Sequence, residues 1–243
     1  DHAEVYYNMG NTLKGKGDLQ SAIDSYKQAI EIKSDYAEVY NNMGTTLLDK
    51  GDLEAAIDSY KQALRIKPDY AETYNNIGNA LQNKGDPESA IASYKQALRI
   101  KPDYAEVYNN MGNVLKDRGD VEAAIDSYKQ ALKIKPDYAE VYNNMGNALN
   151  EKGDLKGAID NYQEAIKIKP DYADAYNNMG NSLKRVKFTK SNFDLMKVIL
   201  SLLNQRISCR PYEIAAAAIS LLKLEPTLKD LLEKHSLGTL RQP

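Results

Sequence analysis

A repeat of 34 residues is the feature that most limits what this chain can fold into. The stretch that begins at Ala3 returns four more times with small changes, and a sixth copy begins at Ala173 and loses the pattern after Leu183. A fixed period of this size is typical of stacked supersecondary units. We therefore expect one array over residues 1–186, with full copies at 3–36, 37–70, 71–104, 105–138 and 139–172 and a partial copy at 173–186.

Each copy contains start and stop signals for two helices. In the second copy, Asp35 stands at the expected N-cap of a first helix, and Glu38 three residues later would complete a capping box. Gly51 is expected to end that helix, Asp52 to cap a second helix, and Pro68 to end the second one. The copies are predicted to be antiparallel helix pairs with a short Lys-Gly-Asp turn.

Apolar residues of these helices fall on single helical stripes. Gly44 and Ala56 are small residues where the two helices of a pair are expected to cross. Tyrosines at the joints between copies are interpreted as inter-repeat packing: Tyr36, Tyr70, Tyr104, Tyr138 and Tyr172. The residues expected to be buried in the second copy are Tyr40, Met43, Gly44 and Leu47 of the first helix, and Ala56, Ile57, Tyr60, Ala63 and Leu64 of the second.

This pattern resembles the tetratricopeptide repeat (TPR). The signature positions in the third copy are Tyr74, Ile77, Gly78, Leu81, Ala90, Tyr94, Ala97 and Pro102. The resemblance covers residues 3–183. It implies an all-α fold, a right-handed superhelical solenoid of antiparallel helix pairs whose first helices line a concave groove. Runs such as YNNMGNSLK at 176–184 are similar to the repeat region of O-linked N-acetylglucosamine transferase and its bacterial relatives.

Asparagine fills three slots of the first helix, on the stripe opposite the core. Asparagine is roughly 0.6 kcal/mol worse than alanine in a helix, so a face made only for water would use Lys, Glu or Gln. An amide can both donate and accept hydrogen bonds, and the resemblance to the transferase family implies a ladder that holds the main chain of a bound peptide. The ladder slots are Asn8, Asn42, Asn76, Asn110, Asn144 and Asn178; the flanking slots are Asn41, Asn75, Asn109, Asn143 and Asn177; the slots one turn further on are Asn11, Asn79, Asn113, Asn147 and Asn181.

Other interpretations of this face stay open. Some asparagines would only bridge neighbouring first helices through amide–amide bonds. An acidic row, which we attribute to helix capping, would favour a basic or neutral peptide if it also faced the groove. Co-chaperone TPR proteins hold a carboxylate with Lys and Arg, and Asn and Glu stand at the matching positions here. The acidic row is Glu4, Glu38, Glu72, Glu106, Glu140 and Asp174.

Residues 187–243 depart from the repeat, because Lys187-Phe188 replaces the expected Gly-Asp turn. Helices are predicted from Ser191 to Leu203, over 212–224, and from Pro226 to about His235. We interpret this segment as a C-terminal helical cap over the apolar end of the stack. A connector to a catalytic domain and a self-association surface are the alternatives.

Composition argues against several function classes. Residues 1–186 carry 23 Lys and Arg against 29 Asp and Glu, and residues 187–243 carry 9 against 5, so no nucleic-acid partner is expected. No apolar run approaches the roughly 18 residues of a membrane span, so no membrane partner is expected. A single cysteine, Cys209, favours a reducing compartment and a cytoplasmic location. His2 and His235 lack neighbours at metal-ligand spacing, so neither metal ligands nor catalytic residues are predicted, and no cofactor.

The sequence therefore predicts a non-catalytic scaffold that binds an extended peptide or protein segment through an asparagine ladder. Two alternatives remain. One is the substrate-recruiting arm of a larger transferase, and the absence of an initial Met together with a start that looks like the end of a preceding copy leads us to expect a piece of a longer protein. The other is a self-assembly module that forms homo-oligomers through the C-terminal helices or the solenoid ends.

Overall fold

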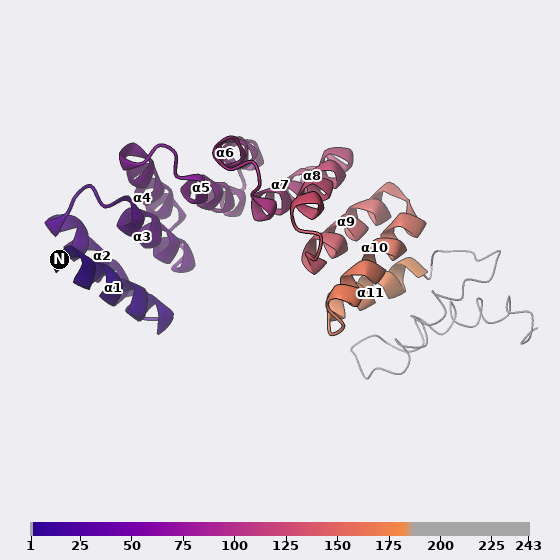
Figure 1. Ribbon diagram of the computed structural model, residues 1–243, viewed down its shortest axis with the longest axis horizontal. Helices are drawn as coiled ribbons and strands as arrows, with labels where there is room; N and C mark the ends of the chain where they lie inside the picture. Colours follow the sequence, from indigo (N-terminus) through magenta and orange to yellow (C-terminus); the bar gives the residue numbers. More distant parts are fainter. Residues whose placement is uncertain (1, 184, 186–243) are drawn as a thin grey trace, which may run out of the picture. The chain divides into compact units, whose positions relative to one another are not determined.

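The computed structural model describes residues 2–183 and 185. The predicted helical cap at 187–243 lies outside the described residues, so its boundary with the array stays a prediction. Within the described range all regular structure is helical, as predicted (Figure 1). The helices are α1 (His2–Gly15), α2 (Leu19–Ile32), α3 (Ala37–Asp49), α4 (Leu53–Ile66), α5 (Ala71–Lys84), α6 (Pro87–Ile100), α7 (Ala105–Asp117), α8 (Val121–Ile134), α9 (Ala139–Lys152), α10 (Leu155–Ile168) and α11 (Ala173–Leu183).

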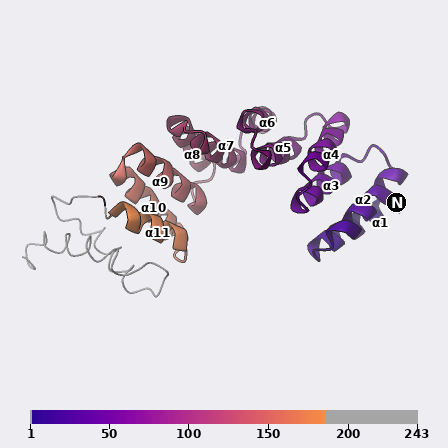
Figure 2. The same cartoon turned by 180° about the vertical axis from the view of Figure 1, so that it is seen from behind.

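The chain forms two compact units, Asp1–Ile134 and Lys135–Pro243. In the first unit, the four helix pairs α1/α2 to α7/α8 follow one another, and the second helix of each of the first three pairs packs on the first helix of the next pair. In the described part of the second unit, α10 packs against both α9 and α11. The two views in Figures 1 and 2 show the paired helices side by side.

The turn inside each pair has the predicted glycine and cap. Gly51 has a positive φ of 88°, and its N–H donates to the Leu48 carbonyl at 2.9 Å. The Asp52 N–H donates to the Leu47 carbonyl at 2.9 Å, which completes a Schellman motif. The Asp52 carboxylate then accepts from the Ala55 N–H at 3.2 Å and caps α4. These two residues therefore reverse the chain as expected.

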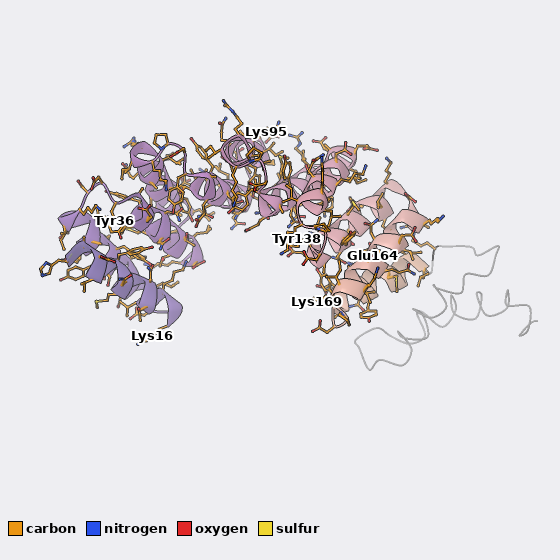
Figure 3. All side chains as sticks on the ribbon, in the orientation of Figure 1. Lys16, Tyr36, Lys95, Tyr138, Glu164 and Lys169 are labelled. Atoms are coloured by element: carbon orange, nitrogen blue, oxygen red, sulfur yellow. The ribbon has the colours of Figure 1, made fainter. Side chains whose placement is uncertain are left out.

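The predicted start of the first helix is wrong. The N-cap of α3 is Tyr36, one residue after Asp35, and no side chain caps this end. Tyr36 packs against a buried cluster at the junction of two pairs, which contains Ala22 and Tyr26 of the first pair and Val39 of the second. This packing confirms the inter-repeat role of Tyr36 (Figure 3) and fixes where α3 begins.

Two local features of Tyr36, its N-cap position and a lysine over its ring, recur in later copies. Tyr70, Tyr104 and Tyr138 are N-caps without a side-chain cap. A lysine three residues earlier lies over each joint tyrosine, with Nζ 4.6 to 5.1 Å from the ring centroid. A cation over an aromatic face is attractive. Since these N-caps have no side-chain hydrogen bond, the capping box predicted for Glu38, Glu72, Glu106 and Glu140 is absent.

The helices of a pair cross where a glycine faces a tyrosine ring. A Cβ added at Gly44 would lie 2.6 Å from Cε1 of Tyr60, whose side chain is completely buried. The predicted close crossing at Gly44 is thus confirmed, and the ring of Tyr60 fills it. Ala56, Ile57 and Ala63 are buried as predicted, whereas Tyr40, Met43, Leu47 and Leu64 are half-buried. The other crossings are Gly10/Tyr26, Gly78/Tyr94, Gly112/Tyr128 and Gly146/Tyr162.

Candidate functional site

The three asparagine slots have different environments, although two of them are neighbours in sequence. In the flanking slot, Asn41, Asn75 and Asn109 of the first unit are 1%, 3% and 2% exposed, and Asn143 of the second unit is 5% exposed. Asn177 is half-buried. A ligand on the surface cannot reach the four buried amides without displacing their neighbours, so these four belong to the support of the face.

The ladder slot lies at the surface of the described helices. Asn8 is exposed, whereas the other ladder residues are half-buried. In the first unit, Asn76 Nδ2 donates to Asn41 Oδ1 at 3.1 Å, and Asn110 Nδ2 donates to Asn75 Oδ1 at 3.1 Å. In the second unit, Asn178 Nδ2 donates to Asn143 Oδ1 at 3.0 Å. Amide–amide bonds therefore do bridge neighbouring first helices, and they hold the ladder side chains in fixed orientations.

The third slot connects the two helices of a pair. Asn11, Asn79 and Asn113 accept, through Oδ1, from the hydroxyls of Tyr26, Tyr94 and Tyr128 at 2.8, 2.7 and 2.8 Å. In the second unit Asn147 accepts from Tyr162 at 2.8 Å, and Asn181 is exposed. These are the same tyrosines that cover the glycines, so one side chain fixes both the helix crossing and the amide above it.

Two substitutions alter this network in the first unit. Tyr7 takes the flanking slot of α1, and its hydroxyl accepts from Asn42 Nδ2 at 3.0 Å. Thr45 takes the third slot of α3 and accepts from the Tyr60 hydroxyl at 3.3 Å. Thr73 is a further participant that the sequence analysis missed, since its hydroxyl donates to Asn41 Oδ1 at 2.9 Å. Its only signal was a polar residue in a slot that is otherwise apolar.

The buried tyrosines stay neutral well above physiological pH. Burial raises the pKa of Tyr60 to about 12 and that of Tyr162 to about 12. Burial also raises the pKa of Tyr94. These hydroxyls remain protonated and act as donors to the third slot.

The acidic row begins one helical turn before the ladder. Glu38, Glu72 and Glu106 precede Asn42, Asn76 and Asn110 by four residues, which places each pair on one face of its helix. Glu72 Oε1 accepts from Asn41 Nδ2 at 3.4 Å, so the row joins the amide network.

Grooves lie at a different place, between successive second helices and over the first helix that separates them. One, of about 490 Å³, lies between α2 and α4 and includes Ile23, Met43 and Leu47. A groove of about 370 Å³ recurs two repeats later, and Lys95, labelled in Figure 3, is on its rim. Val5 and Met9 on α1 are 64% and 51% exposed, whereas Val39 and Val107 in the slot of Val5 are completely buried.

Neither a metal site nor a membrane-spanning helix is found among the described residues. In residues 2–183 and 185, no three His, Cys, Asp or Glu side chains gather in a way that would hold a metal ion. Among the helices just described, none is both long enough and apolar enough to cross a membrane.

Comparison with known proteins gives the family. The model of the TPR repeat matches more than half of the chain, at residues 10–49, 44–85, 83–117, 112–150 and 146–186. The chain belongs to the TPR family. It is thus an all-α repeat solenoid, and the family resemblance predicted from the sequence is confirmed. TPR membership indicates a protein-interaction scaffold.

Solved structures with this fold cover different lengths of the chain. MamA is 27% identical, with a TM-score of 0.62, over 68% of this TPR protein and 96% of MamA. YrrB, described as a TPR protein with an unusual peptide-binding site, is 24% identical, with a TM-score of 0.58. The match covers 70% of this chain and 88% of YrrB. PilF of Pseudomonas aeruginosa is 16% identical, with a TM-score of 0.69. The match covers 96% of this chain and 97% of PilF. A comparison with proteins of curated function finds no match.

Proposed function

We propose that this TPR protein is a non-catalytic scaffold that binds an extended peptide along the asparagine ladder of its first helices. The observation that carries the proposal is the ladder itself. Asn42, Asn76 and Asn110 are half-buried, and each is bonded to the preceding first helix. Side chains held in one orientation lose little conformational entropy when a ligand binds.

The four buried flanking asparagines have a supporting role in this proposal. Asn75 orients Asn110 by accepting from its amide, just as Asn41 orients Asn76. The third-slot residues Asn79 and Asn113 are fixed by tyrosine hydroxyls and form the next turn of the same face. The proposed direct contacts are the ladder residues of each unit, together with Asn11, Asn79, Asn113, Asn147, Asn177 and Asn181.

At 24% identity, similarity to YrrB supports the same fold but not the same binding site. The proposal therefore depends on the amide network of this protein. The two alternative functions, a substrate-recruiting arm of a larger transferase and a self-assembly module, stay predictions.

The test is a selection of linear 12-residue peptides displayed on phage, followed by calorimetric titration of the selected peptides. The double variant Asn76→Ala with Asn110→Ala should bind at least about tenfold more weakly, which corresponds to about 1.4 kcal/mol. Circular dichroism of the variant should retain the helical spectrum.

Tyr94→Phe is the matched control. It removes the hydroxyl that donates to Asn79 and loosens the same network, but it leaves both ladder amides in place and should therefore weaken binding less than the double alanine variant does. An equal affinity of the wild type and the double alanine variant would contradict a role for the ladder.

A further inference from the structure

We propose that the ladder presents oxygen acceptors to its ligand, and that the ligand is a positively charged peptide bound through its own N–H donors. This inference rests on the proposed function and specifies the chemistry of the peptide. It differs from the expectation that the amides would pair with both the N–H and the C=O groups of a main chain.

The direction of the hydrogen bonds carries the argument. An asparagine amide has two hydrogens on Nδ2. Asn110 donates from Nδ2 to Asn75 Oδ1 at 3.1 Å and to Asn79 Oδ1 at 3.3 Å. Asn42 donates from Nδ2 to the Tyr7 hydroxyl and to Asn11 Oδ1, both at 3.0 Å. Both donors of each of these amides are therefore used inside the protein.

Asn76 keeps one donor, because Thr45 stands where its second acceptor would be. Asn76 Nδ2 donates to Asn41 Oδ1. The Thr45 hydroxyl donates to the Asn41 carbonyl at 3.1 Å and accepts from Tyr60. Of the three ladder amides of α3, α5 and α7, only this one has an amide hydrogen left for a ligand carbonyl.

The acceptor side of the ladder is open. Among the residues that the structure describes, no protein donor bonds to Oδ1 of Asn76 or Asn110, and Oδ1 of Asn42 meets only Asn41 Nδ2 at 3.4 Å. A carbonyl oxygen accepts two hydrogen bonds. Peptide N–H groups or lysine and arginine side chains can take these places from water.

Charge along the same helix stripe points to the same ligand. The stripe of α5 is Glu72, Asn76, Asn79 and Asn83, and that of α7 is Glu106, Asn110, Asn113 and Asp117, at spacings of four, three and four residues. Neither stripe contains a cation. Carboxylates strengthen hydrogen bonds from charged donors and oppose the approach of anionic peptides.

Nearby lysines balance only part of this charge. Lys67 pairs with Glu38 at 3.8 Å, Lys14 with Asp49 at 3.3 Å, and Lys116 with Asp117 at 3.0 Å. Within the described range, Glu72 and Glu106 have no cationic partner. The middle of the first unit therefore has both open amide oxygens and unpaired carboxylates.

The experiment uses four acetylated and amidated 12-residue peptides. Three alternate serine with lysine, glutamine or glutamate, and the fourth is the serine–glutamine peptide with every serine nitrogen methylated. Titrations should give affinities in the order lysine, glutamine, glutamate, with about tenfold between the first two. N-methylation should lower the affinity of the neutral peptide about tenfold, because it removes N–H donors without changing charge.

Variants separate local from general charge effects. Glu72→Gln with Glu106→Gln should remove most of the preference for lysine. Glu54→Gln with Glu88→Gln makes the same charge change on second helices and should preserve it. A loss of preference in both double variants would overturn the inference.

The remaining outcomes distinguish the two proposals. Binding of the neutral peptide that is insensitive to N-methylation, or equal affinity for the glutamate peptide, would overturn the acceptor ladder and leave peptide binding intact. Failure of all four peptides to bind, under conditions in which the helical spectrum is retained, would count against both.

Discussion

The joint inside a helix pair and the joint between pairs are built from different interactions. Inside a pair, a tyrosine ring lies directly on a glycine, and the turn combines a left-handed glycine with an aspartate cap. Between pairs, the turn contains neither a glycine with positive φ nor a side-chain cap, and asparagine amides bond one first helix to the next. Inside a pair the crossing is fixed by close packing, whereas the joint between pairs combines tyrosine packing with directional polar contacts between first helices.

The two joints leave different room for a functional surface. Close packing tolerates few changes, because an added methylene group must displace its neighbours. Hydrogen-bonded amides at a partly exposed joint keep unused acceptor positions. A repeat can thus keep its shape in one joint and offer binding groups at the other.

The largest effect is expected for Gly78→Leu, which would break the joint inside a pair. A Cβ at this position would lie 2.4 Å from Cε1 of Tyr94, whose completely buried ring cannot move aside. We expect a loss of about 3 kcal/mol in unfolding free energy, measured by thermal and urea denaturation followed by circular dichroism.

Gly15→Ala is the control for that change. Gly15 also lies in a helix, but a Cβ there would have no neighbour within 4 Å. The alanine should leave stability unchanged or raise it by up to about 1 kcal/mol. Equal destabilisation by both variants would show that the tyrosine contact does not determine the crossing.

Alkaline pH should weaken both joints through their tyrosines. Burial raises the pKa of Tyr60, inside a pair, to about 12, and that of Tyr70, between pairs, to about 12. The unfolded chain loses these protons near pH 10, and the folded chain retains them, so stability is full below pH 10 and falls as the pH rises toward 12. Urea denaturation at pH 7, 9 and 11.5 measures this loss.

Tyr60→Phe tests whether the buried Tyr60 hydroxyl contributes to the loss of stability at alkaline pH. The variant should lose less stability than the wild type between pH 9 and pH 11.5, because it lacks one of the protons retained on folding. Identical pH profiles would mean that other groups cause the alkaline loss.

The smallest effect concerns two aspartates that look alike in sequence. Asp52, inside a pair, caps α4, so Asp52→Ala should cost about 1 kcal/mol. Asp35, between pairs, lies before the tyrosine N-cap of α3 and should change stability by less than about 0.5 kcal/mol when replaced by alanine. Urea midpoints of the two variants test this order. A larger loss of stability for the Asp35 variant would support the capping box that the sequence predicted.

Periodic features of the fold could be predicted from the sequence, because they depend on local spacing. The helix pairs, the glycine turn at Gly51 and the tight crossing at Gly44 all follow from residue order. The start of α3 could not be predicted, since packing of the Tyr36 ring against the preceding pair outweighs the cap preference of Asp35.

The sequence predicted which slots of the first helices carry asparagine, but neither the burial of the flanking slot nor the amide atoms that stay open to a ligand. Asn41 and Asn42 are adjacent in sequence, and a helical rotation of about 100° buries one and leaves the other at the surface. An amide can donate or accept, so only its neighbours decide which atom is left for a ligand. Here the partners are Tyr7 and Asn11, which lie in the preceding repeat.

Thr45 makes one position of the ladder different from its neighbours. Nearly identical rungs would let a bound peptide shift by one repeat with almost no change in energy, so that several alignments would coexist. The threonine interrupts the asparagines of the third slot and leaves Asn76 with an amide hydrogen that Asn110 lacks. In the proposed complex, a peptide carbonyl placed at Asn76 would therefore favour one register over those at Asn42 and Asn110, whose amide hydrogens are both used inside the protein.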